Sequence, residues 1–168
     1  MNFSKLEEKI QSQEAWLTVI GLGYVGLPVA CLFADAGFPV VGLDVDQRKV
    51  DAINQGRCPI EGKEPGLADL LTRVLEEGTF QATTDYAACQ DAHIVLIAVE
   101  TPVDPETKKP LYRALRAVLT ELGQHLQPGT MVIVESTLAP GTMTGLVQPI
   151  LEEASGLRVN QAVVLAHC

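Results

Sequence analysis

The chain has 168 residues, which is long enough for one domain that encloses its own hydrophobic core. Hydrophobic residues make up 47% of it and charged residues 20%, a composition that excludes a disordered or fibrous protein. The net charge of −9 argues against nucleic acid as a partner, because a phosphate backbone is bound by clustered Lys and Arg.

Residues 1–14 predict a short amphipathic helix ahead of the main domain, which we expect at residues 15–168. Phe3, Leu6 and Ile10 recur there at helical spacing among charged neighbours. The segment lacks the apolar core of a secretory signal, and no run in the chain approaches the roughly 18 apolar residues of a membrane span. We therefore expect a cytoplasmic protein with no membrane partner.

Apolar runs rich in β-branched residues then alternate with helical patterns. Several runs are apolar on both alternating faces, as expected for parallel strands covered by helices on each side. The alternation predicts an α/β fold, a Rossmann-type doubly wound sheet that is mostly parallel and six-stranded, with helices on both faces. The strands are expected at 16–21, 39–45, 79–83, 93–99, 130–136 and 161–167, and the helices at 24–36, 47–54, 67–77, 111–126 and 141–154.

A glycine-rich turn follows the first predicted strand. Gly21, Gly23 and Gly26 spell G-x-G-x-x-G at the start of a helix. The first glycine permits the tight turn, the second lets a pyrophosphate approach the backbone, and the third lets the helix pack close to the strand. The N–H groups at the helix start can then bind the diphosphate of a dinucleotide. The residues expected to bind it are Gly21, Leu22, Gly23, Tyr24, Val25 and Gly26.

An acidic residue at the end of the second predicted strand favours dinucleotide binding over a chance match to the glycine pattern. Asp44 lies 18 residues beyond Gly26, near the offset of about 20 at which a carboxylate accepts hydrogen bonds from the adenosine ribose. A carboxylate there repels a 2′-phosphate, so NAD is favoured as the cofactor. Arg48 and Lys49 lie close enough in sequence to leave NADP as an alternative.

The run GLGYVGLPVACLFADAGFPVVGLDVDQRKVDAINQG resembles the UDP-glucose/GDP-mannose dehydrogenase family. Further pieces follow in the family's order: CPIEGKEPGLADLL is similar to its "P-I…E-P-G-L" segment, ETPVD to its "T-P-x-D" loop and ESTLAPGTM to its "S-T-x-x-P-G-T" turn. Together they span about residues 16–145. CPIEGKEPGL is longer than the commonest form of its segment, which favours an N-acetylhexosamine substrate over glucose.

The resemblance implies oxidation of the C6 alcohol of a nucleotide-linked hexose to a carboxylate, with two NAD and a cysteine thioester. It assigns Asp44 and Lys49, with the glycine turn, to the adenosine half of NAD, and Thr101 to the nicotinamide half. Thr137 would lie near the reacting carbon, where its hydroxyl can donate to an oxyanion or orient a water. The alternative for Thr137 is a helix cap near Pro140.

The family's nucleophilic cysteine lies in a downstream "G-G-x-C" motif, beside a Lys and an Asn on a long connecting helix. We expect that helix and the C-terminal substrate domain to be absent here, because the chain ends on an apolar strand. The chain alone is then expected to bind NAD without turnover, and a homodimer is expected of the full-length parent. Cys168 is interpreted as a strand-end residue, and Cys31 and Cys89 as small buried hydrophobes.

Two other functions compete with that of a nucleotide-sugar dehydrogenase domain. One is a stand-alone NAD-binding sensor or partner-binding module that uses the N-terminal helix as its interface. The other is a β-hydroxyacid dehydrogenase, which the T-P-x-D and S-T-x-x-P-G-T matches disfavour. No cysteine or histidine has metal-ligand spacing, so we expect no metal and reduced thiols. His93 and His125 are expected to cap elements or to lie on the surface.

Overall fold

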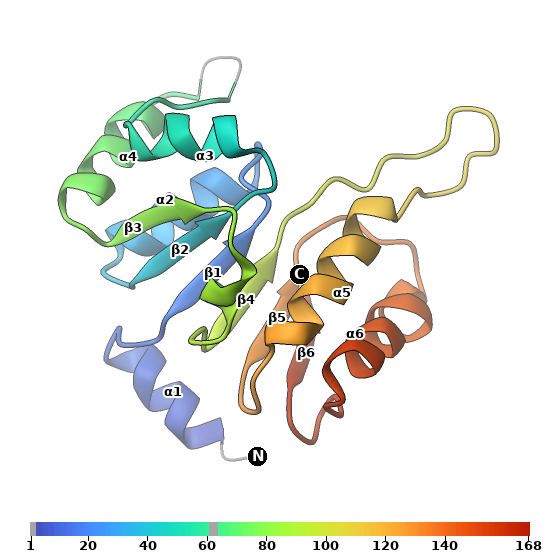
Figure 1. Ribbon diagram of the computed structural model, residues 1–168. Coiled ribbons are helices and arrows are strands. Elements are labelled where there is room, and N and C mark those ends of the chain that lie inside the picture. The colour runs from blue at the N-terminus through green and yellow to red at the C-terminus, as the bar shows by residue number, and fades with distance from the viewer. Residues whose placement is uncertain (1–2, 61–63) are drawn as a thin grey trace.

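A computed structural model describes residues 3–60 and 64–168 (Figure 1). These residues form a six-stranded sheet in the order β3-β2-β1-β4-β5-β6, and every neighbouring pair is parallel. The predicted doubly wound fold is confirmed, and the sheet is wholly rather than mostly parallel. The strands are β1 (Leu17–Ile20), β2 (Val40–Leu43), β3 (Phe80–Thr83), β4 (Ile94–Ile97), β5 (Met131–Val134) and β6 (Val164–His167).

Helices cover both faces of the sheet, as the alternating pattern predicts. The chain runs outward from β1 to β3 and then returns to the other side of β1 at β4, so the strand order reverses between β1 and β4. In such a sheet, ligands bind outside the carboxyl ends of the strands at this reversal point. The helices are α1 (Phe3–Gln11), α2 (Gly26–Asp35), α3 (Gln47–Asn54), α4 (Leu67–Glu76), a 3-10 turn η1 (Tyr86–Cys89), α5 (Arg113–His125), η2 (Met143–Val147) and α6 (Gln148–Ser155).

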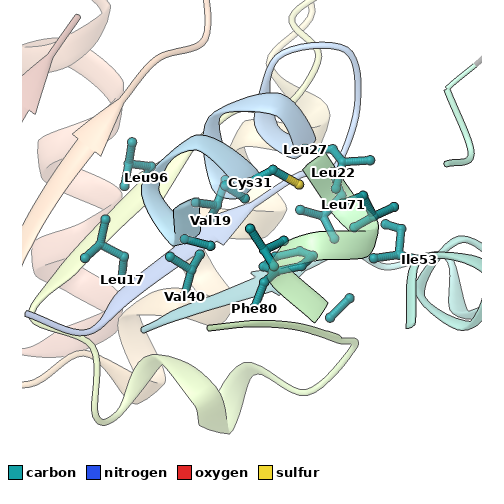
Figure 2. Close-up of a cluster of buried hydrophobic side chains, with 14 of the residues drawn as sticks. Leu17, Val19, Leu22, Leu27, Cys31, Val40, Ile53, Leu71, Phe80 and Leu96 are labelled. Carbon is teal, nitrogen blue, oxygen red and sulfur yellow. The ribbon is translucent and has the colours of Figure 1, made fainter. Parts of the chain in front are cut away.

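The two faces of the sheet carry separate hydrophobic clusters. One cluster joins alternate side chains of β1 and β4 to α2, α3 and α4 (Figure 2). Leu17 and Val19 point into it, together with Leu27 of α2, Leu71 of α4 and Phe80 of β3. The alternation of strand side chains explains the arrangement, because successive residues of a strand point to opposite faces.

The second cluster lies between the sheet and the pair α5 and α6. Ile20, Val95 and Val132 point into it from three strands, against Leu119 and Leu151 of the two helices. Gly123 lets these helices approach closely, because a Cβ on this residue would collide with the Cβ of Ala154. Figure 1 shows the two helices packed side by side on one side of the sheet.

Most helix boundaries differ from the sequence-based expectation by one to three residues, and three of the differences have a local cause. The helix expected from residue 24 begins at Gly26, with Val25 as its N-cap, because the chain uses two more residues to turn. The helix expected within residues 1–14 ends at Gln11, and the φ of 60° at Gln13 breaks it. The helix expected over 141–154 opens with the π-helical segment η2. Pro149 offers no N–H to Gly145, which accounts for the altered turn.

The amino and carboxyl edges of the sheet differ in what surrounds them. Helix α1 lies at the amino edge, before β1, while the exposed segment 98–112 extends from the carboxyl edge after β4 (Figure 1). Within the described part of the chain, no helix is long and apolar enough to cross a membrane. The candidate residues of the sequence analysis all belong to the carboxyl edge.

Candidate functional site

A cavity of about 540 Å³ opens at the carboxyl edge, where the strand order reverses. Its volume lies within the range of about 300–1,000 Å³ typical of small-molecule sites. Of the predicted cofactor residues, the structure places Gly21, Gly23, Asp44 and Lys49 on its wall. Residues that the sequence analysis did not single out complete the wall: Ile20, Leu43, Val45, Asp46, Tyr86, Ala98, Val99, Glu100, Ala114, Ala117, Val118 and Glu121.

The first and third glycines of the turn are required by the protein itself. Gly21 has a φ of 95°, and a Cβ on it would lie 2.7 Å from the carbonyl oxygen of Ala98. A Cβ on Gly26 would collide with the carbonyl oxygen of Gly21. The absence of a side chain at Gly21 therefore lets the turn pack against the end of β4, and its absence at Gly26 lets α2 pack against the turn that follows β1.

The second glycine meets no such constraint. A Cβ on Gly23 would have no atom within 4 Å, and the backbone there does not adopt the left-handed conformation. The space above this residue is therefore available to a ligand that lies on the backbone. Helix α2 starts three residues later, and its N-cap residue Val25 makes no side-chain cap hydrogen bond. Leu27 and Val29 already donate to the carbonyls of Gly23 and Val25, so an anion would meet the helix at the N–H of Gly26, its first residue.

Asp44 is bound to the glycine turn. Its Oδ2 accepts a hydrogen bond of 2.9 Å from the backbone N–H of Leu22 and an ion pair of 2.7 Å from Nζ of Lys49. Its Oδ1 accepts from the N–H of Asp46 at 3.0 Å. The carboxylate is only 6% exposed and thus holds the turn, the end of β2 and the start of α3 together.

The charges around the cavity disfavour a 2′-phosphate. Asp44, Asp46, Glu100 and Glu121 line it, with Lys49 as the one cation among the lining residues. Arg48 is engaged by Asp46, whose Oδ2 accepts from a guanidinium nitrogen at 3.1 Å. This pairing lowers the pKa of the Asp46 carboxyl. Arg48 and Lys49, the two basic residues that left NADP as an alternative, are therefore both paired with carboxylates.

Thr101 and Thr137 come from different loops and meet at the same edge. The Thr101 hydroxyl donates to the backbone carbonyl of Thr137 at 2.8 Å. Residue Thr137 is exposed, and the N-cap of the following helical segment is Thr142, so Thr137 does not cap it. Thr137 follows the carboxyl end of β5, which lies on the same edge of the sheet as the glycine turn after β1.

Two residues that sequence reasoning missed brace these loops. Ser136 is buried, and its hydroxyl donates to the carbonyl of Val99 at 2.7 Å, tying the end of β5 to the end of β4. The Tyr112 hydroxyl accepts from the N–H of Ala139 at 2.9 Å. Ser136 lies inside the ESTLAPGTM motif, so the sequence offered a signal by which it could have been singled out. No sequence signal pointed to Tyr112, because its contact joins residues 27 positions apart.

Tyr86 also escaped the sequence analysis, although it lines the cavity. Burial raises the pKa of its phenol to about 12, and nearby ionisable groups add to the shift. The side chain therefore stays protonated at neutral pH and acts as an aromatic wall. Val45, 81% exposed at the rim, is a second apolar surface of the kind that a flat base can contact.

The cysteines lie away from the glycine turn or are sealed in the core. Cys31 and Cys89 are fully buried, and burial raises the pKa of each thiol to about 12, as expected for small hydrophobes. Cys168 is exposed after β6. The Nε2 atom of His167 lies 3.2 Å from the carbonyl oxygen of Ser136. In the part of the chain that the structure describes, no cluster of His, Cys, Asp and Glu has the form of a metal site.

The wholly parallel sheet, the glycine turn and the acid at the end of β2 define a dinucleotide-binding Rossmann domain of the dehydrogenase type. The open space over Gly23 and the cavity beside it fit NAD. The chain belongs to the UDP-glucose/GDP-mannose dehydrogenase family, whose NAD binding domain matches residues 15–168. The predicted family and cofactor are both confirmed.

Individual relatives act on different sugar nucleotides. The UDP-glucose 6-dehydrogenase AglM of Haloferax volcanii is 37% identical over 153 residues, which are 89% of this chain and 35% of that protein. The GDP-mannose 6-dehydrogenase of Pseudomonas putida is 38% identical over 148 residues, 86% of this chain and 33% of that protein. The crystal structure of NDP-N-acetyl-D-galactosaminuronic acid dehydrogenase from Methanosarcina mazei shares a TM-score of 0.86 at 35% identity, over 97% of this chain and 36% of that chain.

The chain spans about a third of the length of these relatives. Helix α1 lies outside the residues that the family profile matches.

Proposed function

We propose that this chain is the cofactor domain of a nucleotide-sugar 6-dehydrogenase that oxidises the C6 alcohol of a UDP-hexose or UDP-N-acetylhexosamine to a carboxylate. Two molecules of NAD, bound in turn, would supply the hydride acceptor for the two oxidations. The observation that carries the proposal is that the glycine turn and the hydrogen-bonded pair Thr101 and Thr137 all follow strands at the carboxyl edge of one parallel sheet. Relatives named for UDP-glucose, for GDP-mannose and for an NDP-linked N-acetylgalactosaminuronic acid match about equally well, so we leave the sugar open and include GDP-mannose beside UDP sugars in the test.

We propose for these residues the roles that the family resemblance implies, and their positions support them. Gly23 and the start of α2 bind the diphosphate, and Asp44 with Lys49 binds the adenosine ribose. To bind the ribose, Asp44 or Lys49 must weaken the ion pair between them and form a hydrogen bond with a ribose hydroxyl instead. Thr101 positions the loop beside the nicotinamide, and the Thr137 hydroxyl donates to the oxygen on the reacting carbon.

We propose that the chain alone binds NAD without turnover. A thioester step needs an accessible thiolate near the sugar, and Cys31 and Cys89 are sealed in the core. Cys58 packs against the first hydrophobic cluster. Cys168 is exposed, and the described contact of the neighbouring His167 is with the Ser136 carbonyl rather than with this thiol. We expect the nucleophile, and the helix through which a full-length homodimer forms, in the part of the relatives that this chain does not cover.

The experiment is calorimetric titration of the chain with NAD and NADP, together with the variant Asp44→Ala. We expect the chain to bind NAD more tightly than NADP, and the variant to bind NAD more weakly with the preference between the two reduced. Absence of binding to either nucleotide would overturn the assignment of the glycine turn.

Turnover is tested separately, by NADH absorbance with UDP-glucose, GDP-mannose and UDP-N-acetylmannosamine as substrates. We expect none from the chain alone, and activity when the remaining segment of a relative is added. A chain that binds NAD, yet gains no activity with any such segment, would favour the alternative of a sensor or partner-binding module. The unpaired state of all four cysteines supports a reducing compartment, the cytoplasm, for this reaction.

A further inference from the structure

A second cavity, of about 690 Å³, opens at the amino edge of the sheet, opposite the cofactor cavity. Helix α1 forms one wall of it, and the segments before β1, β4 and β5 form the others. Figure 1 shows α1 at the end of the sheet away from the long segment after β4. The residues that line this amino-edge cavity are Lys5, Leu6, Lys9, Trp16, Gln90, Asp91, Ala92, His93, Gln127, Pro128, Gly129 and Thr130.

The charge of this cavity is opposite to that of the cofactor cavity. Lys5 and Lys9 line it, and Asp91 is the one carboxylate among the lining residues. In a chain with a net charge of −9, this is a local concentration of positive charge. Both lysines lie on α1, before residue 15, so they come from the segment that the family profile does not match.

The contact between Lys9 and His93 lacks an acceptor. The Nδ1 atom of His93 accepts a hydrogen bond of 3.0 Å from the backbone N–H of Trp16, so the neutral imidazole carries its hydrogen on Nε2. Nζ of Lys9 lies 2.7 Å from that Nε2. An ammonium group has donors only, and so does a protonated Nε2. An anionic oxygen that lies beside both nitrogens would accept from each of them.

An aromatic surface lies beside these donors. Trp16, the one tryptophan of the chain, lines the same cavity and is 48% exposed. Its backbone is fixed, because its carbonyl accepts from the N–H groups of His93 and Ile94 at 2.9 and 3.2 Å. An exposed indole on a fixed backbone offers a face on which a planar base can stack.

We propose that the amino-edge cavity binds a nucleoside phosphate, with the phosphate at Lys5, Lys9 and Nε2 of His93 and the base against Trp16. The volume suits a ligand of this size. The site is independent of the NAD site, because the two cavities share no lining residue and lie at opposite edges of the sheet.

The test uses the fluorescence of Trp16, which reports on this cavity alone, because the chain has one tryptophan. The full chain is titrated with UDP, with ADP and with inorganic phosphate, and calorimetry follows the same titrations. We expect saturable quenching by the two nucleotides and a weaker response to inorganic phosphate. We also expect the affinity to fall as salt is added, because phosphate contacts are screened.

Variants separate this site from the NAD site. Lys9→Met and Lys5→Met should each lower the nucleotide affinity at least fivefold, whereas Asp44→Ala should leave the quenching curve unchanged. Circular dichroism checks that each variant is folded, and the Lys5 variant serves if Lys9→Met disturbs α1. Quenching that persists unchanged in both lysine variants would overturn the site. Equal affinity for inorganic phosphate and for UDP would overturn the role of Trp16.

Discussion

The hydroxyl of Thr101 donates to the backbone carbonyl of Thr137 at 2.8 Å, and this bond joins the loops that follow β4 and β5. We predict that Thr101→Val loosens the two loops and weakens NAD binding about fivefold, which is the loss of about one net hydrogen bond. Calorimetric titration measures the change. The control is Thr72→Val, which removes a threonine hydroxyl bonded to Ala68 on the exposed side of α4. Equal losses in both variants would contradict a specific role for Thr101.

The second and third glycines of the turn should respond differently to alanine. Gly23→Ala should leave the free energy of unfolding within about 0.5 kcal/mol of the parent chain, because its Cβ meets no atom. It should lower the NAD affinity at least tenfold, because the methyl group occupies the space of the diphosphate. Gly26→Ala should instead cost about 3 kcal/mol or more of stability, because its Cβ collides with Gly21.

Urea unfolding without cofactor measures the stabilities, and titration of the folded variants measures NAD binding. If Gly23→Ala bound NAD as tightly as the parent chain, the diphosphate would have to lie elsewhere.

Asp44 should contribute to stability even without NAD. Asp44→Ala leaves the buried N–H of Leu22 without its acceptor, and we predict a loss of about 2 kcal/mol in the free energy of unfolding. Asp44→Asn keeps an acceptor for Leu22 and should lose less. The matched control is Asp51→Ala on the exposed side of α3, which should change stability by about 0.5 kcal/mol or less. An Asp44→Ala chain as stable as the control would show that the turn holds without this carboxylate.

The thiols should differ sharply in reactivity. Burial raises the pKa of Cys31 and of Cys89 to about 12, so almost no thiolate forms at pH near 8. We predict that iodoacetamide labels Cys168, which is exposed, while Cys31 and Cys89 react only after the chain unfolds. Peptide mass spectrometry identifies the labelled residues. Rapid native labelling of Cys31 or Cys89 would contradict the closed core described above.

Mild acid should destabilise the amino edge. Burial and the nearby Lys9 lower the pKa of His93, while Asp91 opposes the shift. Between this lowered pKa and the ordinary value of about 6.5, the unfolded chain binds a proton that the folded chain does not. The contribution of neutral His93 to the free energy of unfolding is therefore complete above a pH of about 6.5, and it is lost as the pH falls to the lowered pKa. Urea unfolding across this window should show a smaller fall in stability for His93→Asn than for the parent chain.

Sequence patterns predicted the strands and the glycine turn because each depends on local residue order. Apolar runs such as 93–99 and glycines at fixed spacing carry that information directly. The pattern could not place the contacts between distant segments. The Tyr112 bond to Ala139 and the buried Ser136 depend on how the ends of β4 and β5 meet, which only the assembled sheet determines.

The partners of Asp44 show the same division. The offset from Gly26 predicted its place beside the turn, but not that Leu22, Asp46 and Lys49 would already donate to it. The second cavity was equally beyond prediction. His93 was expected to cap a strand or to lie on the surface, and its contact with Lys9 joins residues 84 positions apart.

The unequal demands on the three glycines also bear on how such domains diverge. Gly21 and Gly26 are needed for the chain to fold, so a descendant that no longer uses a dinucleotide would still have to retain them. The fold does not require a glycine at position 23, so larger residues could replace Gly23 once the domain no longer binds a dinucleotide. Among distant members of this fold, the middle glycine is therefore the position whose loss should mark a domain that has kept its architecture and abandoned its cofactor.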